Sequence, residues 1–110
     1  MARHLLPSLR EKKRYVVFEV YSAKAITKHG MINVITEQFI KCFGMFEAAK
    51  AGIIFVEQRE KIGIVKISNA SVDKLRASFA MLDTIDDQKV SIRSIAVSGM
   101  LRKAIAQMGG

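Results

Sequence analysis

Residues 52–68 read GIIFVEQREKIGIVKIS and contain two apolar runs separated by the charged triplet REK. The runs predict strands over residues 52–58 and 62–68, because branched and aromatic side chains favour the pleated strand. A three-residue turn suits an antiparallel hairpin, although this one lacks the usual Asn-Gly or Asp-Gly. We therefore expect two antiparallel strands near the middle of the chain.

A helical pattern precedes this hairpin. Apolar side chains over residues 24–43 recur at three- and four-residue spacing, which is typical of a helix with one buried face. Ser22 is the expected N-terminal cap, Gly44 is the expected end, and residues 45–51 predict a further helical turn or a loop. The apolar stripe consists of Met31, Ile32, Ile35, Phe39, Cys42 and Phe43.

A second helical pattern follows the hairpin over residues 71–83. Ser71 is the expected cap, and Asp73 in the first turn complements the positive end of the helix dipole. The regular spacing of its apolar residues predicts one face packed on the sheet. These residues are Val72, Leu75, Phe79 and Leu82.

Two further strands flank the helices, one over residues 15–21 (YVVFEVY) and one over residues 90–97. The order is then β-α-β-β-α-β. Right-handed crossovers in this order place both helices on one face of a four-stranded antiparallel sheet. The predicted fold is therefore an α+β, ferredoxin-like (RRM-like) sandwich, a fold that by itself selects no function.

The chain of 110 residues has the length of one domain. We expect a basic N-terminal arm at residues 1–14, the ferredoxin-like domain at 15–98, and a C-terminal tail with a short amphipathic helix at 99–110. The longest uncharged runs are far shorter than the ~20 residues that cross a bilayer. Without a secretory leader or a membrane segment in view, the expected location is the cytoplasm.

Positive charge is concentrated at the two ends of the chain. The formal net charge is +8, with 18 Lys and Arg against 10 Asp and Glu. Residues 1–14 carry five basic residues and one acid, and residues 93–110 carry three basic residues and no acid. The remaining segment is almost neutral. This distribution favours a polyanionic partner, most often nucleic acid, over basic tails that only keep the protein soluble.

Residue types that carry catalysis are not arranged in a recognisable set. His4 and His29 have no Cys or His at metal-ligand spacing, and Cys42 falls on the predicted buried stripe. The aspartates at 83, 86 and 87 could gather around Mg²⁺, but Asp-Asp between a helix and a strand is ordinary turn chemistry. We therefore expect no catalytic residues, no metal site and no bound cofactor in this chain.

The features for binding RNA favour phosphate contacts over base stacking. RNA-recognition domains stack bases on aromatic residues of their central strands, but residues 62–67 read IGIVKI. Tyr15 and Tyr21 are the only aromatic residues on the same outer face, and they fit half-buried strand positions better than a stacking platform. Lys and Arg bind phosphates without reading bases. The expected contacts are Arg10, Lys12, Lys13, Arg14, Arg102 and Lys103.

The ferredoxin-like order also predicts where these cations lie. The first and last strands are antiparallel neighbours, so the start of one lies beside the end of the other. The arm and the tail should therefore form a single basic surface at one end of the sheet.

Apolar residues on the outer face and after the first helix predict a covered surface. Their combined area is larger than a lone monomer usually exposes. A protein partner, self-association or the tail helix could cover them. The residues are Tyr15, Val17, Tyr21, Met45 and Phe46.

Three segments together resemble a known family. They are LLPSLREKKRYVVFEV near the start, GIVKI in the predicted third strand, and AVSGMLRK after the last strand. The chain is similar over almost its whole length to the archaeal ribonuclease P protein component 2 family, which has relatives in eukaryotic ribonuclease P and MRP. In this resemblance Ser98 and Gly99 also belong to the RNA-binding set. Met100 stands where the family commonly has threonine.

The resemblance implies a noncatalytic RNA-binding subunit of the endonuclease that removes 5′ leaders from precursor tRNA. The RNA of that enzyme performs the chemistry with Mg²⁺, and precursor tRNA would contact this chain only indirectly. Implied partners are the ribonuclease P RNA and a TIM-barrel-like protein component, with two copies of this chain in a two-plus-two assembly. The alternative is a ferredoxin-like regulatory or protein-interaction domain whose basic ends are incidental.

Overall fold

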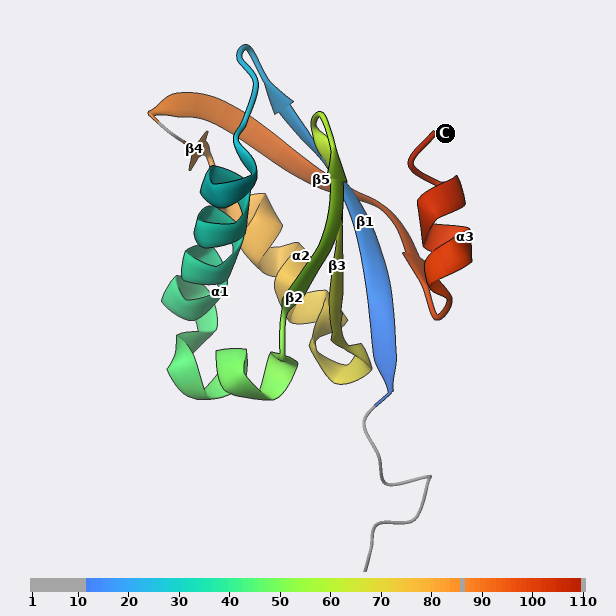
Figure 1. Cartoon of the computed structure of the whole chain (residues 1–110). Helices are drawn as coiled ribbons and strands as arrows, with labels where there is room; N and C mark the ends of the chain where they lie inside the picture. The colour runs from blue at the N-terminus through green and yellow to red at the C-terminus, as the bar shows by residue number, and fades with distance from the viewer. Residues whose placement is uncertain (1–11, 86, 110) are drawn as a thin grey trace, which may run out of the picture.

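A computed structural model describes residues 12–85 and 87–109 (Figure 1). Its first half contains β1 (Lys13–Ser22), α1 (Lys28–Ala51), β2 (Ile54–Arg59) and β3 (Ile62–Ser68). Its second half contains the 3₁₀ turn η2 (Asn69–Ser71), α2 (Val72–Met81), β4 (Thr84–Ile85), β5 (Gln88–Ser98) and α3 (Leu101–Ala106). The predicted alternation of strands and helices is present.

The strands form one antiparallel sheet in the order β2-β3-β1-β5-β4. The four longer strands have the ferredoxin-like order, but the expected count of four is wrong, because β4 adds a fifth. This two-residue strand pairs with the start of β5, Thr84 opposite Lys89. The turn between them includes Asp87 at φ 63°, a left-handed conformation that Asp tolerates better than most residues. Asp87, in the segment where a turn was predicted, therefore lies between the two paired strands of a small hairpin.

The first helix differs from its predicted form at both ends. It begins at Lys28 and is capped by Thr27, whose side-chain oxygen accepts a hydrogen bond from the Gly30 amide at 3.0 Å. Ser22 is not the cap, since its hydroxyl donates to the Lys24 carbonyl instead. At Gly44 the backbone leaves the helical region with φ 91°, and a second helical segment then continues.

That second segment ends at Gly52, which has φ 59° and donates its amide to the Ala48 carbonyl. Gly52 is thus a helix cap rather than the first residue of a strand, and β2 begins at Ile54. The second helix is also shorter than predicted and ends at Met81. Ser71 precedes it but makes no capping hydrogen bond through its side chain.

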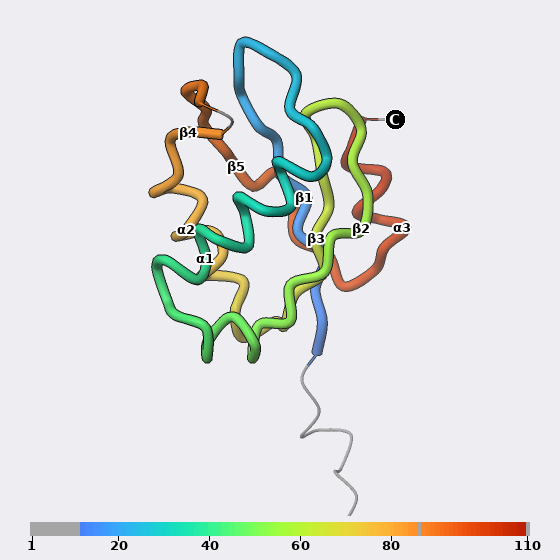
Figure 2. The backbone as a smooth tube through the Cα atoms, turned by 60° about the vertical axis from the view of Figure 1, so that its left-hand side comes forward, coloured from blue at the N-terminus to red at the C-terminus, as the bar shows by residue number. Residues whose placement is uncertain are grey.

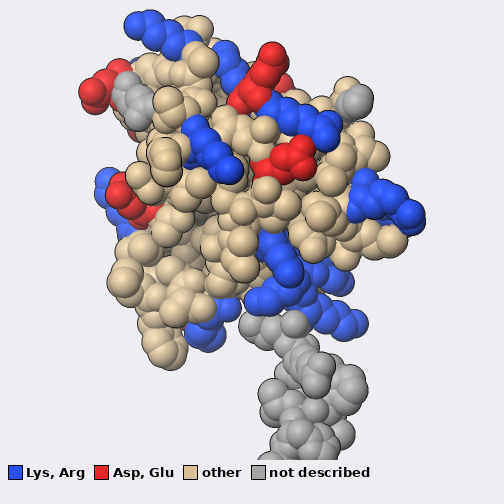
Figure 3. All heavy atoms as spheres, in the orientation of Figure 1, with Lys and Arg blue, Asp and Glu red and all other residues tan. Residues whose placement is uncertain are grey.

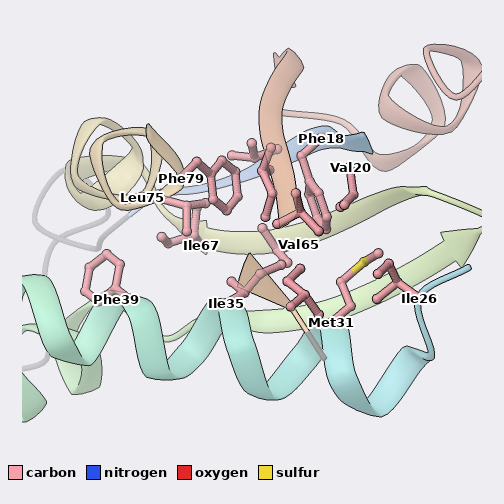
Figure 4. Close-up of a cluster of buried hydrophobic side chains, with 14 of the residues drawn as sticks. Phe18, Val20, Ile26, Met31, Ile35, Phe39, Val65, Ile67, Leu75 and Phe79 are labelled. Carbon is pink, nitrogen blue, oxygen red and sulfur yellow. The ribbon is translucent and has the colours of Figure 1, made fainter. Parts of the chain in front are cut away.

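The main core lies between the sheet and the two longer helices (Figure 4). Phe18 is fully buried at its centre, with its ring centroid 5.4 Å from that of Phe79 and 6.2 Å from that of Phe55. Gly63 lies directly under this ring, because a Cβ built there would be 2.6 Å from Phe18 Cζ. Residue 63 must therefore be glycine for Phe18 to occupy the core.

A second, smaller core lies on the opposite face of the sheet beneath α3 (Figure 2). Val17 and Ile64 from the sheet are buried there against Ala104 and Met108. Of the three coverings left open by the sequence, the tail helix is the one that covers Val17. Within the described ranges, no helix has the length and apolar character needed to cross a membrane.

Candidate nucleic-acid interface

The start of β1 and the end of β5 lie side by side. Tyr15 of β1 is paired with Ser98 of β5. On the other edge of β1, Lys13 is paired with Ser68 of β3. The chain just before the strand is also fixed, because the Asn69 amide donates to the Lys12 carbonyl at 2.7 Å. The backbone therefore holds the last residues of the expected arm against two neighbouring segments, β3 and η2.

Arg14 connects this region to the turn after β5. A methyl group built on Gly99 would lie 3.5 Å from Arg14 Nη1 and 3.9 Å from its Cζ. Nη1 also donates to the Lys13 carbonyl at 3.0 Å. The guanidinium therefore lies beside the turn that leads into Arg102 and Lys103, and the single basic surface expected from the strand order stays a prediction.

Hydrogen bonds within the turn fix its shape. Ser98 Oγ accepts from the Met100 amide and donates to the Met100 carbonyl, each at 3.0 Å. This serine therefore stabilises the turn through its hydroxyl. The Met100 side chain, at the position where threonine was expected, is 45% exposed.

The tail helix presents its cations to solvent. Arg102 and Lys103 are exposed on α3, whereas Ala104 is buried on the sheet. Arg102 lies in the first turn and opposes the helix dipole, which is a small cost to stability, whereas Lys103 lies in the last turn, where a cation is favourable. The position of Arg102 is therefore not explained by the stability of the helix.

Lys13 has a structural contact as well as an exposed position. A Cβ built on Gly52 would lie 3.5 Å from Lys13 Nζ, which places the ammonium at the C-terminal end of α1. The carbonyls there carry partial negative charge that a cation stabilises. Lys13 thus has a role in the fold that Lys12 does not share.

Lys66 is a further cation that the sequence analysis missed. It is paired with Tyr15 across β1 and β3, and its Nζ lies 5.9 Å from the centroid of the Tyr15 ring. The IGIVKI segment was considered only as a site for aromatic residues. Lys66 follows Ile62 and Ile64 at every second position of the strand, so it lies on the same outer face of the sheet. We define the basic patch as Lys12, Lys13, Arg14, Lys66, Arg102 and Lys103.

Figure 3 shows basic side chains gathered where β1 begins, with no acidic side chain among them on this face. No salt bridge found in the described part of the chain involves a residue of the basic patch. These cations are therefore not neutralised by paired carboxylates there. Arg10, which was expected to belong to the same surface, lies outside the described residues.

The expected protein-contact residues separate into two groups. Val17 is fully buried and Tyr15 is partly buried, both in the cluster beneath α3. Tyr21 is 42% exposed, and its hydroxyl donates to Glu19 and accepts from Arg93, each at 3.0 Å. The second group is Met45 and Phe46, just after the kink in α1. They are 70% and 77% exposed, more than any other large apolar residue in the described part of the chain.

Two of the groups with catalytic chemistry, Cys42 and Asp83, make contacts with neighbouring side chains. Cys42 is partly buried with its Sγ 3.8 Å from Met81 Sδ, beside a groove of about 730 Å³ between α1 and the end of α2. Asp83 accepts from the Thr84 hydroxyl within the turn to β4. His29 is exposed, and His4 and Asp86 lie outside the described residues. Over residues 12–85 and 87–109, no three His, Cys, Asp or Glu side chains gather as metal ligands.

Comparison with known proteins gives a consistent result. The sequence model of the Rpp14/Pop5 family matches residues 14–108. Ribonuclease P protein component 2 of Thermococcus kodakarensis is 30% identical over 113 residues, which covers 97% of this chain and 94% of that protein. The protein of the same name from Methanocaldococcus jannaschii is 30% identical over 104 residues, covering 94% of this chain and 78% of that one.

The fold is also found in a solved structure. A chain in the cryo-EM structure of yeast ribonuclease MRP aligns with a TM-score of 0.70 at 16% identity, covering 84% of this chain and 78% of that chain. This likeness concerns the fold, whereas the match to the family's sequence model extends from Arg14 in β1 through the tail helix. The chain therefore belongs to the Rpp14/Pop5 family.

Proposed function

We propose that this chain is a noncatalytic RNA-binding subunit of ribonuclease P, which supports the catalytic RNA in removing 5′ leaders from precursor tRNA. Family membership and the names of the archaeal relatives support the assignment to this enzyme. The observation that supports the RNA-binding part is the position of the Arg14 guanidinium beside Gly99, in the turn that leads into Arg102 and Lys103.

The proposed mechanism is neutralisation of phosphate charge. Arginine guanidinium groups make paired hydrogen bonds to phosphate oxygens, and lysine ammonium groups act as point charges. Cations on one rigid surface lower the repulsion between RNA segments that pack together, so less Mg²⁺ is needed for the active RNA fold. The reacting Mg²⁺ belongs to the RNA in this proposal, and the chain itself binds no cofactor.

Protein partners in this proposal are a TIM-barrel-like component and a second copy of the chain in a two-plus-two assembly in the cytoplasm. The exposed pair Met45 and Phe46 supports a protein contact, because large apolar side chains exposed together mark interaction surfaces. Precursor tRNA would be contacted through the RNA and not by this chain.

The test is reconstitution of precursor-tRNA cleavage from the RNA and proteins, with and without this chain, over a series of Mg²⁺ concentrations. The proposal predicts that the chain lowers the Mg²⁺ concentration needed for half-maximal cleavage. Charge reversal at Lys12, Arg14 and Arg102 should abolish this effect. A matched triple reversal at the exposed Lys28, Lys41 and Arg76 changes net charge equally and should preserve it.

The alternative, a ferredoxin-like interaction domain with incidental basic ends, predicts a different result. Cleavage would then depend on the chain equally in the two triple variants. Exposed Met45 and Phe46 would be its contact surface, as they are for the protein partner in the ribonuclease P proposal. Purified chain that shows no salt-sensitive RNA affinity would support it over the ribonuclease P proposal.

A further inference from the structure

The strand β5 has a free edge along most of its length. On one side it pairs with β1 from Val90 to Ser98, and on the other it pairs with β4 only at Gln88 and Lys89. No described strand lies beyond this edge in the order of the sheet. Residues 91–98 therefore present unpaired backbone groups along roughly 25 Å of strand.

This edge is apolar. Ile95 is 40% exposed and Val97 is 42% exposed, and Met100 follows at 45%. Strand edges are usually protected by charged side chains, proline or bulges, because an open edge pairs with other chains. Here the segment has one bulge, where Ile95 is the extra residue opposite β1, and no proline.

The single cation on this segment does not guard the edge. Arg93 donates to the Tyr21 hydroxyl at 3.0 Å, and its guanidinium carbon lies 5.6 Å from the centroid of the Tyr21 ring. It is thereby held over β1 and away from the free side. The opposite edge of the sheet differs, because β2 carries the ion pair of Glu57 and Arg59 at 2.8 Å.

The charge near the edge indicates the chemistry of its partner. Residues 88–109 contain four cations and no acidic residue. A second copy of this chain would bring the same cations to the interface, so charge disfavours self-pairing. RNA is disfavoured as well, since exposed isoleucine and valine beside backbone amides match a peptide strand better than a phosphate chain.

We propose that the free edge of β5 over residues 91–98 receives an extended segment of a protein partner, which adds to the sheet as a further strand. This segment is apolar at alternate positions, where it meets Ile95 and Val97, and acidic at its ends. Backbone hydrogen bonds supply most of the affinity, and the cations set the charge preference. The pairing edge itself lies at β5 and shares only Arg102 and Lys103 with the basic patch.

The test uses the full chain and the synthetic peptide Asp-Glu-Val-Thr-Ile-Thr-Val-Glu-Asp, with amide hydrogen exchange read by NMR. At a peptide concentration about ten times its Kd, amides of residues 91–98 should exchange roughly tenfold more slowly. Val97→Asp should weaken peptide binding by about tenfold, since it removes an apolar contact and places a charge at the edge that repels the acidic peptide. Ile54→Asp is the matched control, because Ile54 is 56% exposed on the β2 edge, and binding should be unchanged.

Two control peptides separate strand pairing from simple charge attraction. The same peptide methylated on alternate backbone nitrogens keeps its charge but cannot complete the ladder, and it should not protect residues 91–98. A peptide with Lys in place of its acids should bind more weakly. Thermal melting of both variants confirms that they remain folded.

Three kinds of result would overturn the proposal. The first is a lack of specificity, seen either as equal binding of the methylated peptide or as protection of amides at the β2 edge. The second is protection of residues 91–98 that appears without peptide and grows with protein concentration, which would assign the edge to a second copy. The third is protection of these amides by RNA but not by the acidic peptide.

Discussion

The guanidinium of Arg14 lies against the backbone of Gly99, at the distance of ordinary van der Waals contact for a methyl group built there. One residue belongs to the first strand and the other to the turn after the last. This proximity places Arg14 beside the turn that leads into Arg102 and Lys103, and it is the basis for proposing that the two ends of the chain act as one surface.

Substitution of Gly99 tests the contact directly. Gly99→Ala adds a methyl group 3.5 Å from Arg14 Nη1, which the surroundings accommodate. We expect unchanged RNA affinity, and stability equal to or up to about 1 kcal/mol above that of the wild type, because alanine restricts the unfolded chain. Gly99→Phe should displace the guanidinium and weaken RNA binding. Equal RNA affinity for the two variants, measured by filter binding, would contradict this role of Arg14.

Gly63→Ala should destabilise the fold. Its Cβ would lie 2.6 Å from Phe18 Cζ, within a fully buried cluster that has no room to move. Overpacking of this kind costs about 1–3 kcal/mol. Urea denaturation measures the loss, and the added substitution Phe18→Leu should recover part of it. An unchanged midpoint in Gly63→Ala would show that the ring is not confined as described.

Lys12 and Lys13 should respond differently to neutralisation. Lys13 Nζ lies near the C-terminal cap of α1, so Lys13→Gln should cost about 0.3–1 kcal/mol of stability in addition to RNA affinity. Lys12→Gln should reduce RNA affinity alone. Thermal melting at low ionic strength measures the difference in stability between the two variants. Identical melting curves would show that Lys13 does not stabilise the fold.

The pair Glu47 and Lys74 should make stability depend on acid pH. Their side chains meet at 2.7 Å between the second segment of α1 and α2, and this hydrogen bond lowers the pKa of Glu47. A carboxyl whose pKa is lower in the folded state stabilises the fold above its unfolded pKa, and this contribution is lost as pH falls through the folded pKa. Glu47→Gln should therefore be less stable than the wild type at neutral pH.

The difference between the two proteins should disappear in acid, where Glu47 is protonated. Denaturation curves at several pH values measure it. A difference that persists unchanged below the folded pKa would show that the substitution acts through packing rather than charge.

The sheet was predictable because its strands are bounded by local signals. The segment at residues 62–68 forms a strand with the expected limits, since its alternation and flanking charges agree. The position of the start of β1 beside the end of β5 also followed from strand order alone. Elements whose limits depend on tertiary contacts were predicted less accurately. The strand β4 was not predicted, because its two residues are too few to show an alternating pattern.

The details of α1 required the structure. Ser22 and Thr27 are both good caps by type, and only the path of the loop decides that Thr27 faces the free amides. Gly44 was correctly expected to end a helix, but the continuation after the kink depends on packing of the second segment. Lys66 was missed because one lysine in an apolar strand has no pattern of its own, and its relation to Tyr15 exists only across strands.

The salt dependence of RNA affinity tests most directly whether both ends of the chain form one anion-binding surface. Each neutralised phosphate contributes roughly 0.7 to 0.9 to the slope of log affinity against log salt. The account predicts that Arg14→Gln and Arg102→Gln each lower the slope by about one such step, and that the double variant lowers it by about two. The exposed control pair Lys28→Gln and Arg76→Gln should leave it unchanged. A slope that responds to only one chain end, or to the control pair equally, would contradict the account.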